Sequence, residues 1–369
     1  MRTLSSFLLL VGLFTVALIA PSAHAIPQDG RYLYVAVPGI RNYLEYGGHG
    51  VLVYDIDDGH RLVRRIPSAG LNDNGEPMNV KGICASAATG RLYVSTIKTL
   101  QCYDLLTDEL LWEQSYPGGC DRMSITADGR TLYVPSFEKD HWNVVDAADG
   151  KVVAVITPDN RAHNTIVSPD GTEVYLEGLS SPNLTVVDTA TNQITRTVGP
   201  FSASIRPFTV NGRQTRLYAN VNDLLGFGIG NLETGEVITE VTVQGFEQGP
   251  IKRHGCPSHG IALSLDETEV WLADAANQRV HVFDVTTDTP RQLTSIAVHD
   301  QPGWITFSID GRLVYPSTGE VIDRESRQII AKLRDEHGNL VMSEKMVEVD
   351  FWGREVSATG NQFAIGGVR

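Results

Sequence analysis

The chain has 369 residues, with 44 acidic against 30 basic side chains, so its formal net charge at pH 7 is −14. A surface this acidic repels phosphate backbones, so no nucleic acid is expected as a partner. The charges are spread along the chain without an acidic tail or a linker of biased composition, which indicates one domain.

The first 25 residues have the pattern of a secretory signal peptide. Arg2 supplies a positive charge, an apolar run covers 7–20, and Ala23-His24-Ala25 is a small-x-small cleavage site. The apolar run is too short to predict a membrane span. We therefore expect residues 1–25 to be removed. The remaining 26–369 would form a single domain that is secreted or periplasmic, with no stable membrane span.

The segment 163–199 shows the basic unit of the fold. It contains four short β-runs, NTIVS, TEVYLEG, LTVVDT and QITRTVG. Turn-forming residues separate them, such as Pro169-Asp170-Gly171 after the first run. Their alternating apolar and polar residues are typical of half-buried strands. A sheet of four such strands cannot bury both faces alone, so it needs copies of itself.

Two marks of this unit recur along the chain. One is an aromatic residue in the second strand, found at Tyr34, Tyr93, Tyr133, Tyr175, Tyr218, Trp271 and Tyr315. The other is a polar residue that closes the third strand, found at Asp55, Asp104, Asp146, Asp188, Asn231, Asp284 and Asp323. The intervals between these closing residues are 49, 42, 42, 43, 53 and 39 residues, which is typical of propeller blades. The sequence predicts an all-β, seven-bladed β-propeller with four antiparallel strands per blade, in which each closing Asp or Asn accepts hydrogen bonds from the following turn.

The first blade lacks an inner strand of its own. In five blades this strand begins twelve residues before the aromatic mark, at Asp121, His163, Arg206, His259 and Gly303. In the second blade it begins at Gly82, and for Tyr34 the same count falls inside the predicted signal peptide. The segment 345–351, KMVEVDF, is left over after the seventh blade and alternates as a strand does. We predict that it closes the ring as the inner strand of blade one.

The repeated strand sequences point to a known family. LYVST, LYVPS, VYLEG and LYANV are each followed by a third strand and a turn of the T-x-T-N or A-x-D-G kind. This pattern resembles the YVTN family of β-propeller repeats, which is similar to the heavy chain of quinoprotein amine dehydrogenases and to the propeller of nitrous oxide reductase. The resemblance covers essentially the whole mature chain. It implies the fold, whereas propellers carry many unrelated functional sites.

Long loops are predicted at one end of the ring. In a propeller the inner strands begin at one mouth of the channel, and the connections between blades and between second and third strands lie on that face. The long connections there are 38–50, 69–81, 137–142 and 243–258, whereas the opposite face has short turns such as 127–129. Binding residues concentrate on loops that a rigid scaffold holds, so we predict that the loop-rich face is functional.

Polar side chains are predicted to surround the channel on this face. They are Lys81, Asp121, Arg122, His163, Arg206, His259 and Lys345. In an acidic protein, cations around one opening would attract a carboxylate or a phosphate. Pro207 fixes the backbone after Arg206, whose planar guanidinium would suit bidentate capture of such an anion. The alternative is that the charges pair with one another, for instance Asp121 with Arg122 or Arg206.

A metal site is a second hypothesis for the same face. The segment 253–260, RHGCPSHG, contains His254, Cys256 and His259, which are ligand types that suit zinc or copper. Their spacing matches no established metal motif. The alternative is that His259 and His163 bond backbone groups at the channel mouth.

Cysteine usage does not define a disulfide framework. An exported chain can form disulfides, but this one has neither a CxxC motif nor tightly spaced cysteines. A chain of this length does not need them to fold. The pairing is therefore open for Cys84, Cys102, Cys120 and Cys256.

Two functions fit these features. The first is an exported binding module that holds a small anionic ligand or another exported protein at the channel mouth. The second is an enzyme, such as a lactonase, a lyase or a dehydrogenase subunit, that uses the histidines and arginines there, with or without a bound metal. The chain has no G-x-S-x-G, H-E-x-x-H or phosphate-loop motif, so no catalytic residue is assigned, and the binding module is favoured.

Overall fold

A computed structural model describes residues 29–369 except 68, 253, 254 and 369. The predicted signal peptide, 1–25, lies outside the described residues. Within them, no helix is long and apolar enough to cross a membrane. The only helix in this part of the chain is the short 3-10 helix η1 (Leu44–Tyr46).

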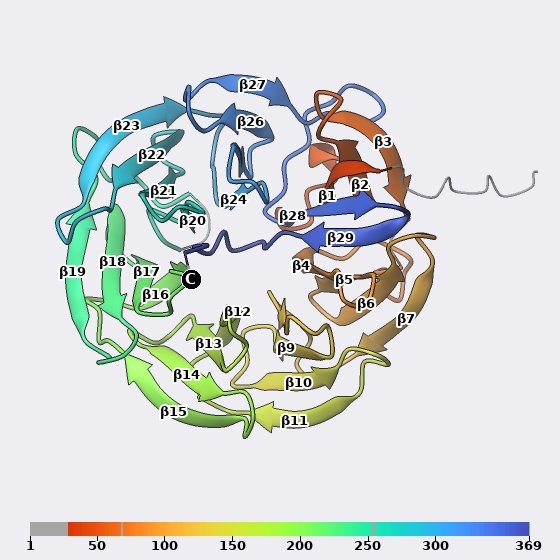
Figure 1. Cartoon of the computed structure of the whole chain (residues 1–369), viewed down its shortest axis with the longest axis horizontal. Helices are drawn as coiled ribbons and strands as arrows, with labels where there is room; N and C mark the ends of the chain where they lie inside the picture. Colours follow the sequence, from red (N-terminus) through yellow and green to blue (C-terminus); the bar gives the residue numbers. More distant parts are fainter. Residues whose placement is uncertain (1–28, 68, 253–254, 369) are drawn as a thin grey trace, which may run out of the picture.

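Seven antiparallel sheets stand in a ring around a central channel, so the chain is a seven-bladed β-propeller, as predicted (Figure 1). The inner strands of blades two to seven are β4 (Val80–Ser86), β8 (Ser124–Ile125), β12 (Ala162–Val167), β16 (Ile205–Val210), β20 (Ile261–Leu263) and β24 (Ile305–Phe307). The second strands of blades one to seven are β1 (Gly30–Val37), β5 (Arg91–Thr96), β9 (Thr131–Pro135), β13 (Glu173–Gly178), β17 (Arg216–Val221), β21 (Glu269–Asp274) and β25 (Leu313–Pro316).

The outer half of each blade repeats in the same way. The third strands are β2 (Gly50–Asp55), β6 (Thr99–Asp104), β10 (Trp142–Asp146), β14 (Leu184–Asp188), β18 (Gly226–Asn231), β22 (Arg279–Asp284) and β26 (Glu320–Asp323). The outer strands are β3 (Arg61–Ile66), β7 (Leu110–Ser115), β11 (Val152–Ile156), β15 (Gln193–Val198), β19 (Val237–Thr242), β23 (Arg291–Ala297) and β27 (Ile329–Lys332).

The polar residue that closes each third strand has the predicted role. Asp104 Oδ1 accepts hydrogen bonds from the backbone N–H groups of Leu106 and Thr107, both at 2.9 Å. Asn231 does the same in blade five for Glu233 and Thr234. The closing residue therefore fixes the turn to the outer strand by bonding backbone groups that the ladder leaves unpaired.

The apolar core lies between neighbouring blades. One cluster joins Tyr34 and Val53 of blade one to Leu92 and Val94 of blade two, all four without exposed surface. Each blade thus buries its faces against the next, which explains why the sequence needs repeated copies of the unit.

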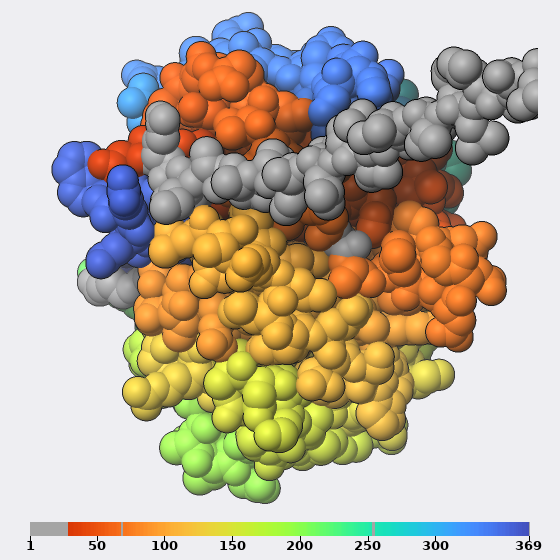
Figure 2. Space-filling model, turned by 90° about the vertical axis from the view of Figure 1, so that its right-hand side faces the viewer, coloured from red at the N-terminus to blue at the C-terminus, as the bar shows by residue number. Residues whose placement is uncertain are grey.

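Blade one closes the ring by pairing the first strand of the described chain with a C-terminal strand, as predicted. Strand β28 (Met346–Trp352) pairs antiparallel with β1, placing Val347 opposite Tyr34. Figure 2 shows this closure at the rim, where the blue C-terminal strands lie against the red start of β1.

The structure differs from the prediction of four strands in every blade, because blade one has five. Strand β29 (Glu355–Thr359) pairs with β28 at its free edge. Gly353 and Arg354 both have positive φ, 61° and 67°, which is the backbone of a two-residue hairpin turn that follows strand twist. The extra strand covers the edge that β28 would otherwise expose.

After β29 the chain crosses the channel. We call residues 360–368 the C-terminal strap; in Figure 1 it runs through the middle of the ring and ends beside β16. Trp304 Nε1 of blade seven donates to Gln362 O at 2.6 Å. Leu263 N of blade six donates to Ala364 O at 3.0 Å, and Gly366 N donates to Val210 O of blade five at 2.9 Å. The strap thus ties together three consecutive blades of the ring.

Candidate functional site

The fold brings the predicted polar residues to the start of the inner strands. Backbone groups of Arg122 and Asn164 form a parallel bridge between blades three and four. This bridge places Asp121 beside His163, although 42 residues separate them. Residues at the same position in successive blades therefore become neighbours around one opening.

Asp121 is the centre of the first polar group. Its side chain is 1% exposed, with Oδ2 2.9 Å from His163 Nδ1 and Oδ1 3.4 Å from Lys81 Nζ. Although burial alone would raise the pKa of Asp121, Lys81 and His163 lower it below its ordinary value. Lys81 also lies 5.0 Å from the ring centre of Phe137. This carboxylate is therefore held in its charged form by two partners.

Arg122, Glu344 and Lys345 form a second, fully buried group. Arg122 Nη2 lies 3.4 Å from Glu344 Oε2, and Lys345 Nζ donates to Glu344 Oε2 at 2.9 Å and to Gly39 O at 2.7 Å. Burial lowers the pKa of Lys345 to about 7, and the attraction of Glu344 only partly offsets it. Arg122 and Lys345, two of the cations predicted for the mouth, are thus buried and paired with Glu344.

The alternative that the charges pair with one another holds for Asp121, but not with Arg122 or Arg206, the partners given as examples. Asp121 forms its ion pairs with Lys81 and His163 instead. Arg122 instead lies beside Glu344 and the ring of Trp304.

Arg206 differs from the other cations of the mouth. Its side chain is half-buried, and Nε donates to Asn222 Oδ1 at 2.8 Å. A Cβ atom at Gly255 would lie 3.1 Å from Arg206 Nη2, so the guanidinium runs close under the loop backbone there. Within the described ranges, no carboxylate forms an ion pair with it.

Glu177 and Asn164 were not predicted from the sequence. Glu177 is fully buried in β13 and accepts a hydrogen bond from Asn164 Nδ2 at 2.6 Å. Burial raises the pKa of Glu177, although His163 and Arg206 act against it. The signal was a glutamate inside the apolar strand sequence VYLEG, since charged residues are almost never fully buried without a role or a partner.

Several buried polar atoms of the inner two strands have no hydrogen-bond partner among the described residues. They are Arg122 Nη1, Asn164 Oδ1, Glu177 Oε1 and Asn220 Nδ2. Buried polar groups in native proteins are nearly always paired with protein, water or ligand. The channel wall therefore has hydrogen-bonding capacity that the described chain does not use.

The residues proposed for a metal are placed only in part. Cys256 is buried, its Sγ donates to Val221 O at 3.3 Å, and burial raises its pKa to about 12. His259 is buried with Nδ1 3.0 Å from Gly303 O, which is the backbone contact considered as the alternative. His254 lies outside the described residues. In the part of the chain that is described, no three His, Cys, Asp or Glu side chains are grouped to hold a metal ion.

Cys84, Cys102, Cys120 and Cys256 are all buried and form no disulfide.

Comparison with known proteins supports the fold. No protein family matches this chain, and no curated protein sequence matches it. Many solved structures share the architecture. One is dihydro-heme d1 dehydrogenase NirN in complex with DHE, similar over 90% of this chain and 71% of that chain, with a TM-score of 0.61 and 15% identity. At that identity the likeness shows the β-propeller fold alone, and membership of the YVTN family stays a prediction.

Proposed function

We propose that this protein is an exported binding propeller that holds a small anionic molecule at the loop-rich mouth of its channel. The observation that supports this most directly is the state of Arg206. Asn222 orients its guanidinium, and no carboxylate of the described residues is paired with it. A half-buried, oriented guanidinium is well suited to bind a carboxylate or a phosphate through two N–H groups.

The surroundings of Arg206 favour an anion. Burial raises the pKa of Glu177, which disfavours a negative charge in this part of the channel. Asp121 is compensated by Lys81 and His163. A ligand anion would therefore meet a locally positive opening in a protein whose net charge is −14.

A solved relative in fold is compatible with a binding role. NirN is described in complex with DHE, so a propeller of this shape is known with a bound ligand. The likeness does not carry that ligand to this chain, and the proposed class of ligand rests on Arg206 and its neighbours.

The test is binding of a panel of small anions, namely acetate, succinate, citrate, phosphate and sulfate, by thermal shift and calorimetry. At least one should raise the melting temperature of the wild type by mass action. Arg206→Lys keeps the charge but loses the planar fork, and should weaken binding at least about tenfold, because hydrogen bonds to charged groups contribute about 1.5–3 kcal/mol each.

The matched control is Arg130→Lys, because Arg130 is an exposed arginine in a turn of the opposite face. It should bind as the wild type does. If no anion shifts the wild-type curve, or if Arg206→Lys binds as tightly as Arg130→Lys, the anion site is wrong. Capture of another exported protein by the same face would then be the occupant to test, with Arg206→Lys and Arg130→Lys as the same pair of variants.

Export is tested separately from binding. The protein should be found in the extracellular or periplasmic fraction, and its N-terminal sequence should start near Ile26. A chain that starts at Met1 in the cytoplasm would contradict export and leave the binding test unaffected.

A second candidate function is an enzyme, and the Asp121–His163 pair favours it. A buried carboxylate on Nδ1 fixes the imidazole so that Nε2 is the atom that can accept a proton. Incubation of any bound anion with the protein, followed by NMR of the ligand, decides between the two. Turnover that His163→Gln abolishes would identify an enzyme of the lactonase, lyase or dehydrogenase type; an unchanged ligand supports the binding module.

A further inference from the structure

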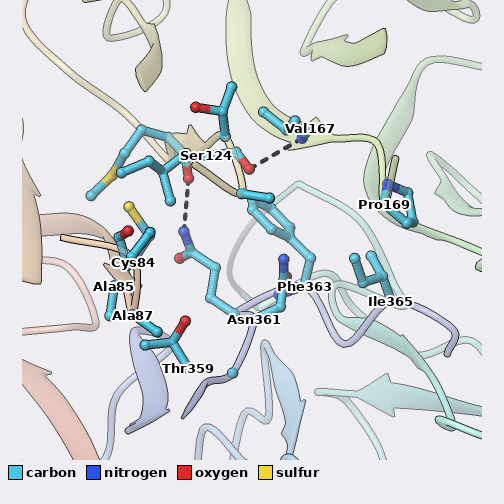
Figure 3. A pocket seen from close by; sticks show the side chains of 18 of the residues that line it. Cys84, Ala85, Ala87, Ser124, Val167, Pro169, Thr359, Asn361, Phe363 and Ile365 are labelled. Carbon is cyan, nitrogen blue, oxygen red and sulfur yellow. Dashed lines mark hydrogen bonds between the residues drawn. The ribbon is translucent and has the colours of Figure 1, made fainter. Parts of the chain in front are cut away.

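A cavity lies at the opposite end of the channel from Arg206. It has a volume of about 340 Å³ and is bounded by the C-terminal strap and by the ends of β4, β8 and β12 with the turns that follow them. Figure 3 shows it from close by, with Cys84, Ser124 and Val167 from the blades facing Asn361 and Phe363 of the strap. Its size falls in the range of small-molecule sites, about 300–1,000 Å³.

The chemistry of this cavity is the reverse of that at the mouth. None of its lining residues is charged. Its polar side chains include hydroxyls and two carboxamides, from Ser86, Ser124, Thr126, Ser168, Thr359, Asn361 and Gln362. An ion placed here would lose its hydration without meeting an opposite charge, which disfavours charged ligands.

Some of these groups keep unused hydrogen-bonding capacity. Ser86 is 4% exposed, and its Oγ forms no hydrogen bond within the described part of the chain. Ser124 Oγ accepts a bond from Val167 N at 3.1 Å, so its hydroxyl hydrogen is still available to donate. Asn361 Oδ1 accepts from Phe363 N at 2.7 Å, which leaves its NH₂ group as a donor.

Apolar surface completes the wall. Met123 directly precedes β8, Ile125 and Val167 come from β8 and β12, and Phe363 and Ile365 come from the strap. Such surface suits the carbon skeleton of a ligand, whereas a pure hydrocarbon would leave the hydroxyl groups unpaired.

We propose that this cavity is a second binding site, for a small neutral molecule rich in hydroxyl groups, such as a monosaccharide. A hydroxyl group both donates and accepts, so it matches a wall that offers an unpaired acceptor at Ser86 and donors at Ser124 and Asn361. The site is independent of the anion site at the mouth, because it lies at the other end of the channel and shares no residue with it.

The experiment uses the full chain and a panel of glycerol, glucose and galactose, with glucuronate and glucosamine as charged counterparts. A neutral member should raise the melting temperature and bind in calorimetry, and the charged counterparts should not. Ser86→Ala should weaken binding about fivefold, the effect of one neutral hydrogen bond of about 1 kcal/mol. It should not lower stability, because the hydroxyl has no partner to lose.

A filling variant locates the site. Ala87 is half-buried and lines the cavity, so Ala87→Phe should abolish binding, whereas Ala190→Phe, at an exposed turn of blade four, should not. Cys84 gives a native reporter, since its buried thiol lines the same cavity. Bound sugar should slow alkylation of Cys84, measured by peptide mass spectrometry, in proportion to occupancy.

Three results would overturn the proposal. They are no stabilisation by any neutral member of the panel, equal binding by Ala87→Phe and Ala190→Phe, and stabilisation without protection of Cys84. If Ala87→Phe does not fold, Ser86→Ala and the Cys84 reporter still decide.

Discussion

The guanidinium carbon of Arg122 lies 3.4 Å from the ring centre of Trp304. Trp304 in turn donates its indole N–H to Gln362 O of the C-terminal strap at 2.6 Å. The Arg122 guanidinium at the mouth therefore stacks on the Trp304 ring, and the strap holds that ring from the opposite end of the channel. The strap therefore supports the residues of the mouth and also crosses the opposite end of the channel.

Gln362→Ala should destabilise the protein. Gln362 Nε2 donates to Met123 O at 2.9 Å, and its Oε1 accepts from Ile83 N at 3.3 Å. The variant leaves both buried backbone groups unpaired, so the free energy of unfolding should fall by about 2–4 kcal/mol. Urea unfolding measures it. Gln328→Ala, at an exposed glutamine, is the control and should stay within about 0.5 kcal/mol of the wild type; an equal effect of the two variants would contradict the role of the strap.

Asp121→Asn should lower the free energy of unfolding and make it depend less on pH under acidic conditions. The variant removes the partner of both Lys81 and His163, and we expect a loss of about 2–4 kcal/mol at pH 7. The folded pKa of Asp121 is below its ordinary value of 3.8, so its stabilising effect is present above that pH and is lost as the pH falls through the folded value. Chemical unfolding between pH 7 and pH 3 measures this.

The control for that series is Asp73→Asn, in an exposed loop position. It should leave stability and its pH dependence unchanged. Parallel pH profiles for the wild type and Asp121→Asn would show that the carboxylate charge is not what holds the network.

Lys345→Met should change how stability depends on alkaline pH. The pKa of Lys345 is about 7 in the folded protein, against 10.5 as its ordinary value. Between these values the unfolded chain binds more protons, so the wild type gains stability as the pH rises, by at most about 1.4 kcal/mol per pH unit. Glu344, Arg122 and Lys81 are the other charges that act on this amine. Urea unfolding from pH 7 to pH 10 should show the slope in the wild type and its loss in the variant. Equal slopes would contradict the lowered pKa of Lys345.

Deletion after Ser343 should destroy cooperative folding. It removes β28, β29 and the strap, which leaves β1 with an unpaired edge and opens the ring. We expect aggregation in size-exclusion chromatography and a broad thermal transition. A monomeric product with the melting temperature of the full chain would mean that closure is dispensable.

The metal hypothesis stays a prediction that elemental analysis tests. If His254, Cys256 and His259 bind zinc or copper, the purified protein should contain near-stoichiometric metal, and Cys256→Ser should lose it. Binding to the folded state should also raise the melting temperature by mass action. Absence of metal, together with no thermal shift on adding either ion, would rule the site out.

Local features of the sequence were enough to predict the architecture. Strands alternate with a period of two, and each ends at a turn residue such as Asp104 or Asn231, so the blade count and strand ends can be found without long-range contacts. Counting back from Tyr34 also predicted that β28 would close the ring. The missed strand β29 follows a two-residue turn. The strap has no period at all, because its hydrogen bonds go to six separate blades.

For the candidate site too, the sequence predicted one part and the tertiary structure decided the other. The sequence placed Lys81, Asp121, His163 and Arg206 at one opening, because each starts an inner strand or lies beside one. Which of them pair was decided only by the tertiary structure, which joins Asp121 to Lys81 and His163 and leaves Arg206 without a carboxylate among the described residues. Repeat spacing determines position around the ring, whereas contact across the channel depends on side-chain directions that no single blade encodes.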